Sequence, residues 1–251
     1  METIADPGAA RRELVLTWAT AIALLGLARV ASSLEPTGLL RGNLGALAAV
    51  LFVVLPEREL RRRGEGWAEQ GLPWWGAADG RTWRAWAKGA GWALAIGAAV
   101  FPLFVLAFWG WAELAPRLPG ALAQAAPGPL RLEPRLPPRF ALLAASQFLV
   151  VALPEEMFYR GFLQTAWART DPGRRRRVLG AEIGAGFLPT QALFAAGHLL
   201  SLEPWRLATF FPGLLFGWAR ARTGGLAAPV VLHLLSNLLL ATLEASLAGA
   251  R

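Results

Sequence analysis

The chain has 251 residues, of which 55% are hydrophobic, and a formal net charge of +8. This apolar share exceeds the roughly 45 to 50% of soluble domains and predicts a multi-pass membrane protein. The absence of cysteine excludes disulfides, thiolate metal sites and a cysteine nucleophile. The basic residues fall between apolar runs and form no stripe with aromatic residues, so we expect contact with the lipid bilayer and no binding of nucleic acid.

Apolar runs long enough to span a bilayer core of about 30 Å recur along the chain. The N-terminal half is predicted to hold three spanning helices, over residues 14–34, 43–56 (or from 39) and 89–111. We interpret the first as an uncleaved helix rather than a signal peptide, because it is long and further spans follow. The C-terminal half is predicted to hold four, over residues 140–170, 179–200, 204–222 and 226–247. These runs predict an all-α transmembrane bundle of about seven helices.

Two segments interrupt the apolar runs. Residues 57–88 form a polar, Trp-rich linker, which would add an eighth helix if it entered the membrane. Residues 113–139 are rich in Pro and Gly and predict an irregular loop. We therefore expect residues 1–139 to form an N-terminal transmembrane scaffold and residues 140–251 to form a second helical core.

The placement of arginine predicts the orientation in the membrane. The N-terminal segment, residues 57–88, residues 169–177 and the pair Arg220 and Arg222 fall on one side of a seven-helix alternation. Because short cytoplasmic loops carry an excess of Lys and Arg, this side is predicted to be cytoplasmic, with the N-terminus inside. Four arginines on the opposite side weaken the bias: Arg117, Arg131, Arg135 and Arg139.

Two adjacent glutamates, Glu155 and Glu156, lie in an apolar stretch. A charged side chain at the bilayer centre costs about 2.5 to 3.5 kcal/mol, so residues of this kind are functional candidates. At about 100° per residue the two carboxylates leave a helix in different directions, which predicts different roles. Glu156 stands four residues before Arg160, the favourable order for an ion pair, so Glu155 is expected to be the freer carboxylate.

The only two histidines of the chain also lie in apolar stretches. His233 and Asn237 share one helix face at i,i+4 spacing, and Phe194 and His198 share a face of another helix. Two imidazoles, one carboxylate and one amide can hold and polarise a water and stabilise an oxyanion, which suffices to hydrolyse an amide without a covalent nucleophile. Taken singly, each residue also fits a structural role between helices, but their co-occurrence favours a functional site.

Three short motifs carry these residues in order. Residues 155–160 read EEMFYR and match EExxxR, residues 194–198 read FAAGH and match FxxxH, and residues 233–237 read HLLSN and match HxxxN. The ordered set resembles the CPBP family of intramembrane proteases, which includes the CAAX prenyl endopeptidases and bacteriocin-processing (Abi) proteins. The resemblance makes residues 140–251 a CPBP-like catalytic core.

The resemblance implies an intramembrane endopeptidase that hydrolyses a peptide bond of a membrane-associated protein or peptide. It implies that Glu155 activates the attacking water with the help of His198, while His233 and Asn237 form the oxyanion hole. Glu156 and its arginine partner would organise the site or contact the substrate. We expect no cofactor and a location in a bacterial inner membrane.

Two alternatives stay open. A zinc-dependent form of the same hydrolysis would use the two histidines and a glutamate as ligands, although these lie on three helices without the compact HExxH spacing. A non-catalytic membrane scaffold or a carrier would also hold intramembrane Glu, Arg and His. A carrier more often shows broken helices in matching halves, a pattern that this sequence lacks.

The predicted helix boundaries conflict with the predicted site. At 1.5 Å per residue, Glu155 lies about 22 Å from Phe140. His198 falls near the end of the helix over 179–200, on the side of the membrane where the helix over 140–170 begins. We expect the three motifs to converge, and therefore expect at least one of these boundaries to be wrong.

Overall fold

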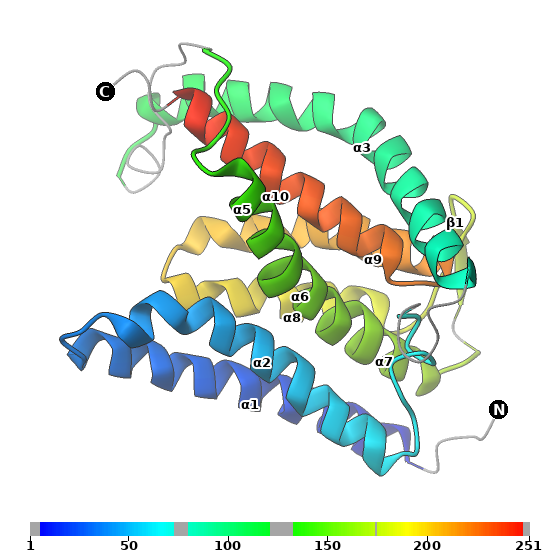
Figure 1. The fold of residues 1–251 in the computed structure, drawn as a ribbon. Helices are drawn as coiled ribbons and strands as arrows, with labels where there is room; N and C mark the ends of the chain where they lie inside the picture. Colours follow the sequence, from blue (N-terminus) through cyan, green and yellow to red (C-terminus); the bar gives the residue numbers. More distant parts are fainter. Residues whose placement is uncertain (1–5, 73–79, 121–132, 174, 248–251) are drawn as a thin grey trace.

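The computed structural model describes residues 6–72, 80–120, 133–173 and 175–247 (Figure 1). These residues form long helices and one short hairpin, which confirms the predicted all-α class. The first three helices are α1 (Pro7–Leu34), α2 (Leu39–Arg62) and α3 (Gly80–Leu114). The later ones are α5 (Phe140–Ser146), α6 (Leu153–Glu156), α7 (Thr165–Arg169), α8 (Phe187–Gly197), α9 (Phe210–Thr223) and α10 (Ala227–Leu247).

Helices α5, α6 and α7 are joined by π-helical segments and form one continuous rod, so the described residues contain seven helices. Five of them are long and apolar enough to cross a membrane: Pro7–Leu34, Leu39–Arg62, Thr82–Leu114, Phe140–Arg169 and Ala227–Ser246. The other two are shorter, with 11 residues in α8 and 14 in α9. The chain is therefore an integral multi-pass membrane protein.

Helix α2 extends through residues 57–62 and α3 begins at Gly80, so the irregular part of the predicted linker is shorter than residues 57–88. An i,i+4 ion pair between Glu57 and Arg61, with 2.6 Å between Oε1 and Nε, supports the last turns of α2. Residues 73–79 lie outside the described residues.

The predicted loop over residues 113–139 begins close to the end of α3, which lies at Leu114. Residues 121–132 of this loop lie outside the described part of the chain.

Residues from both predicted parts of the chain share one hydrophobic core. Leu14 of α1 and Phe52 of α2 are buried together with Phe158 and Phe162 of the rod. The rings of Phe52 and Phe158 lie 4.8 Å apart between centroids. The position of the rod, and with it the position of the Glu155–Glu156 pair, therefore depends on the first two helices.

The predicted helix over 140–170 is not a uniform α-helix. Residues Gln147–Ala152 and Met157–Gln164 are π-helical and flank the four-residue α6, which carries both glutamates. Pro154 provides no N–H, so the regular backbone ladder is interrupted here. The π-helical turns on either side of α6 are uncommon in proteins and are found most often at functional sites.

The predicted helix over 179–200 is wrong at its N-terminal end. Residues Arg176–Val178 (β1) and Ala181–Ile183 (β2) pair as an antiparallel hairpin instead. Leu179 and Gly180 form its turn with φ of 48° and 79°, as a two-residue turn between twisted strands requires. Helix α8 consequently begins at Phe187 and is about 16 Å long rather than the roughly 33 Å expected for 22 residues. His198 follows directly after this short helix, which resolves the conflict of depths.

The start of the predicted helix over 204–222 also differs, since Pro204–Thr209 form a 3₁₀ helix before α9. Leu202, with φ of 61°, turns the chain between α8 and this segment. As Figure 1 shows, α8 and α9 lie side by side, with α1 and α2 on one side of them and α3 and α10 on the other. The pair therefore lies in the middle of the bundle.

Arginine-bearing segments gather at one end of the bundle. Arg11 of α1 donates through Nε to Thr170 Oγ1 at 2.8 Å, after the end of the rod. Arg169 pairs with Glu65, which follows α2, at 2.7 Å. Figure 1 shows the first residues of α1, the chain after α2 and the hairpin at this same end. These contacts hold together segments that the sequence predicts on one side of the membrane.

Candidate active site

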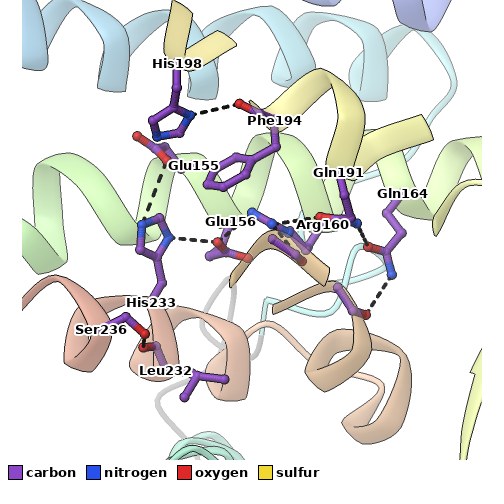
Figure 2. Close-up of polar contacts among 12 residues, drawn as sticks. Glu155, Glu156, Arg160, Gln164, Gln191, Phe194, His198, Leu232, His233 and Ser236 are labelled. Atoms are coloured by element: carbon purple, nitrogen blue, oxygen red, sulfur yellow. Dashed lines mark hydrogen bonds and ion pairs between the residues drawn. The ribbon is translucent and has the colours of Figure 1, made fainter. Parts of the chain in front are cut away.

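The candidate residues come from three parts of the fold. Glu155 and Glu156 lie on α6, and Arg160 follows in the second π-helical segment. His198 is the first residue after α8. His233 lies on α10, one helical turn before the sixth candidate, Asn237. Figure 2 shows Glu155 between the two imidazole rings, with Glu156 and Arg160 to one side.

Glu156 and Arg160 form the predicted ion pair. Arg160 Nη1 donates to Glu156 Oε1 at 2.8 Å, and both side chains are fully buried. The guanidinium also lies over the ring of Phe194, 4.3 Å from its centroid. Moving two such charges out of water costs several kcal/mol per ion, which their mutual attraction and further hydrogen bonds must offset, so removing either partner would leave an uncompensated buried charge. The four-residue spacing predicted this contact, and the prediction is confirmed.

His233 contacts both glutamates through different ring nitrogens. Its Nδ1 lies 2.8 Å from Glu156 Oε1, within hydrogen-bond distance, and its Nε2 lies 4.0 Å from Glu155 Oε2. A carboxylate accepts, so Nδ1 is the donor. Phe216 stacks on the same imidazole with 4.7 Å between ring centroids. The ring is therefore held on one face and at one nitrogen, and its other nitrogen is directed at Glu155.

His198 is held in the same way by its own helix. Its Nδ1 lies 2.9 Å from the carbonyl oxygen of Phe194, and a carbonyl can only accept, so Nδ1 carries the proton. The Phe194 ring packs against both imidazoles, 4.7 Å from His198 and 6.1 Å from His233 between centroids. Nε2 of His198 therefore carries the lone pair, and Figure 2 shows the His198 ring next to the carboxylate of Glu155.

Glu155 is the freer carboxylate, as predicted. Its side chain is 17% exposed, whereas that of Glu156 is 0% exposed. Glu155 Oε2 is buried and accepts no hydrogen bond from any described residue. A carboxylate oxygen of this kind can accept a hydrogen bond from a water or a substrate group.

Asn237 contacts a residue that the sequence motifs do not include. Its Nδ2 donates to Gln147 Oε1 at 2.8 Å. Gln147 is the first residue of the π-helical segment before α6. The structure therefore brings Glu155, Glu156 and His233 into direct proximity and places Asn237 one helical turn further along α10.

Comparison with protein-family models matches residues 137–239 to the family described as type II CAAX prenyl endopeptidase Rce1-like. The chain carries an Rce1-like domain. The predicted resemblance to the CPBP family is thereby confirmed, and the matched segment contains all six candidate residues. Comparisons with curated proteins and with solved structures gave no match.

Two further polar residues of the Rce1-like domain extend the buried network. Arg160 Nη2 donates to Gln191 Oε1 at 2.8 Å, and Gln191 Nε2 donates to Gln164 Oε1 at 3.1 Å. Gln164 Nε2 in turn donates to the carbonyl oxygen of Gly217 at 3.0 Å. Because a carbonyl accepts and a guanidinium donates, the two ends of this chain fix the orientation of both amides.

Sequence spacing contains a signal for both glutamines. Gln164 stands four residues after Arg160, and Gln191 stands seven residues before His198, which places each on the same helix face as a motif residue. Neither belongs to the three short motifs, so motif matching alone passes over them. Their burial, at 8% exposed for Gln164 and 0% for Gln191, is what marks them as part of the site.

The Rce1-like domain does not assemble its acidic and imidazole groups as a metal site. Among the described residues, no three His, Asp or Glu side chains are placed so that they could hold one metal ion. Both Nδ1 atoms are occupied, by Glu156 and by a backbone carbonyl, which leaves the two Nε2 atoms free. The spacing of the described side chains, and not the state of their ring nitrogens, is what does not fit a zinc ion in this arrangement.

An open apolar groove lies elsewhere, between α3 and α10. It is lined by Leu94, Gly97, Ala98, Phe101, Pro102, Val105, Leu106 and Leu235. None of the six candidate residues takes part in it. The groove is therefore separate from the site of the Rce1-like domain.

Proposed function

We propose that the protein is an intramembrane endopeptidase in which Glu155 acts as general base on a water. The observation that carries this proposal is the environment of Glu155. Its carboxylate lies between two imidazoles, and one of its oxygens is buried without a hydrogen-bond donor among the described residues. The neighbouring acid, Glu156, also has one oxygen, Oε2, without a donor among the described residues, but its Oε1 is held by Arg160 and His233 and its side chain is fully buried, so Glu155 is the acid that water can reach.

The imidazoles have complementary tasks in this proposal. The Nδ1 proton of His198 is directed to a carbonyl, so Nε2 of the neutral ring carries a lone pair and helps Glu155 orient the water. His233 donates Nδ1–H to Glu156, so its Nε2 becomes a donor when the ring is protonated.

Hydrolysis then follows from these positions. Glu155 takes a proton from the water as the oxygen attacks the carbonyl carbon of the scissile peptide bond. The negative charge that develops on the carbonyl oxygen is stabilised by the Nε2–H of His233 and by the amide of Asn237. The C–N bond of the tetrahedral intermediate then breaks as Glu155 delivers the proton to the leaving nitrogen, which yields an amine and a carboxylic acid and restores the Glu155 carboxylate.

We further propose that the arginine-rich end of the bundle is cytoplasmic, that the membrane is a bacterial inner membrane, and that residues 1–139 act as a transmembrane scaffold for the catalytic core. The substrate is a membrane-associated protein or peptide. The family description names CAAX prenyl endopeptidases, so a farnesylated peptide with a C-terminal CAAX sequence is the first probe.

The test compares purified wild type with Glu155→Gln in detergent or vesicles, with cleavage of the farnesylated CAAX peptide as the readout. Loss of a general base lowers the rate about 10²- to 10⁴-fold. Glu57→Gln is the matched control, because it makes the same chemical change at an acid far from the site and should leave the rate unchanged. Equal rates for Glu155→Gln and wild type would refute the assignment, and a comparison of protein termini in cells carrying either form extends the test to unknown substrates.

A further inference from the structure

The rod and α10 face each other through two polar contacts. At the first, His233 contacts the glutamates of α6. At the second, Asn237 Nδ2 donates to Gln147 Oε1 at 2.8 Å. Gln147 lies eight residues, or about two helical turns, before Glu155, and Asn237 lies one turn after His233. The two helices are antiparallel, so the amide contact lies about one turn along α10 from the contact between His233 and the glutamates.

The amide contact decides which atom of Asn237 can act. An asparagine side chain carries a donor nitrogen and an acceptor oxygen, and only the nitrogen can stabilise an oxyanion. Gln147 Oε1 accepts one N–H of Asn237 and so fixes the direction of Nδ2. The second N–H of that nitrogen is left for the substrate. Without this acceptor the amide can turn and present its oxygen to the developing negative charge.

We propose that Gln147 is a positioning residue for Asn237, and that it acts by holding the Asn237 amide with its nitrogen toward the scissile carbonyl. This inference rests on the proposed function, because it assigns the oxyanion role to Asn237. Gln147 begins a π-helical segment, the type of backbone irregularity that is most frequent at functional sites. Gln147 Oε1 accepts from Asn237, and Gln147 Nε2 donates to no described residue. Among the described residues, the hydrogen bond to Asn237 is therefore the one that the Gln147 side chain makes.

The kinetic test uses Gln147→Leu, Asn237→Ala and the double variant on the farnesylated CAAX peptide. Loss of an oxyanion donor in Asn237→Ala lowers kcat about 10²- to 10³-fold. Misplacement of the same donor in Gln147→Leu lowers kcat by about 10- to 100-fold, with KM little changed. The double variant should be no slower than Asn237→Ala, because Gln147 acts through Asn237. A wild-type kcat in Gln147→Leu, or losses that multiply in the double variant, would overturn the proposal.

A second readout does not depend on turnover. The same four proteins are unfolded by heat in detergent, and the Tm loss of the double variant should be smaller than the two single losses added together. Asn43→Leu is the control, because Asn43 is an exposed amide of α2 whose hydrogen bond to a described residue, Leu39, lies within its own helix. It should change neither Tm nor kcat. Additive Tm losses in the site variants would overturn the contact.

The outcomes separate this inference from the proposed function. Suppose that wild type cleaves the peptide, that Glu155→Gln does not, and that Gln147→Leu cleaves as fast as wild type. The endopeptidase assignment then stands, and the proposed role of Gln147 is refuted. If wild type leaves the peptide intact, the assignment of a prenylated CAAX substrate fails. In that case the Tm comparison alone decides whether Gln147 holds Asn237.

Discussion

His233 Nδ1 and Glu156 Oε1 lie 2.8 Å apart, and that same carboxylate oxygen accepts from Arg160 Nη1 at 2.8 Å. One oxygen therefore couples the orientation of the imidazole to a fully buried ion pair. Any change that moves Arg160 moves Glu156, and any change that moves Glu156 releases the imidazole.

Glu156→Gln is expected to destabilise the protein, because it leaves the Arg160 charge buried without its counter-ion. Breaking a buried pair in this way costs about 3 to 5 kcal/mol. Glu57→Gln removes an ion pair with the same i,i+4 spacing at an exposed site and should cost no more than about 0.5 kcal/mol. Unfolding in detergent measures both variants. Equal losses would show that burial of the Glu156–Arg160 pair contributes nothing.

Gln191→Leu is expected to disturb the site through the hydrogen bonds that hold Arg160. The substitution removes the acceptor of Arg160 Nη2 and the donor to Gln164 Oε1. A buried polar group left without its partner costs about 1 to 3 kcal/mol, so stability and turnover should fall together. Asn43→Leu, which removes an exposed amide, should leave both unchanged. Full activity in Gln191→Leu would show that this hydrogen-bond network does not contribute to turnover.

Gly217→Ala is expected to break the same network by steric contact alone. A Cβ atom at this position would lie 2.6 Å from Gln191 Nε2 and 2.9 Å from Gln164 Oε1. Overpacking of this kind costs about 1 to 3 kcal/mol. Gly110→Ala in α3 has open space around it and should be neutral or slightly stabilising, because alanine favours helices. A comparison of the two Tm values checks this prediction, and a stabilised Gly217→Ala would contradict it.

Removal of metal is expected to leave turnover unchanged. The described His, Asp and Glu side chains are not placed to share one ion, so the reaction is expected to proceed on the protein groups alone. Activity after dialysis against a strong chelator, together with elemental analysis of the active protein, tests this directly. Stoichiometric zinc whose removal abolishes turnover would require the metal-dependent mechanism.

The orientation in the membrane can be tested with single cysteines, because the natural chain has none. Gly173 lies at the arginine-rich end, and Thr37 lies in the turn between α1 and α2. Both residues are exposed, so each is replaced by cysteine in a separate variant, Gly173→Cys and Thr37→Cys. In intact cells a membrane-impermeant maleimide should label Thr37→Cys only, and Gly173→Cys should react after the membrane is opened. The reverse pattern would place the arginine-rich end outside.

Much of the fold follows from the hydropathy of the sequence. The long apolar runs predicted the membrane class and the five longest helices, because spans of this length leave few other structures in a bilayer. The start of α8 was predicted eight residues too early, because the hairpin over residues 176–183 contains apolar residues next to charged ones. Hydropathy alone does not distinguish such a hairpin from the first turns of a helix.

The sequence by itself determined the residue types of the site and the contacts within one helix. The four-residue spacing from Glu156 to Arg160 predicted their ion pair, since i,i+4 neighbours on a helix are always close. Only the tertiary structure decided that His233 bonds Glu156, that Gln147 accepts a hydrogen bond from Asn237, and that Gln191 accepts one from Arg160. Those contacts join different helices, and their register depends on the π-helical turns and on the late start of α8, which no spacing along the chain encodes.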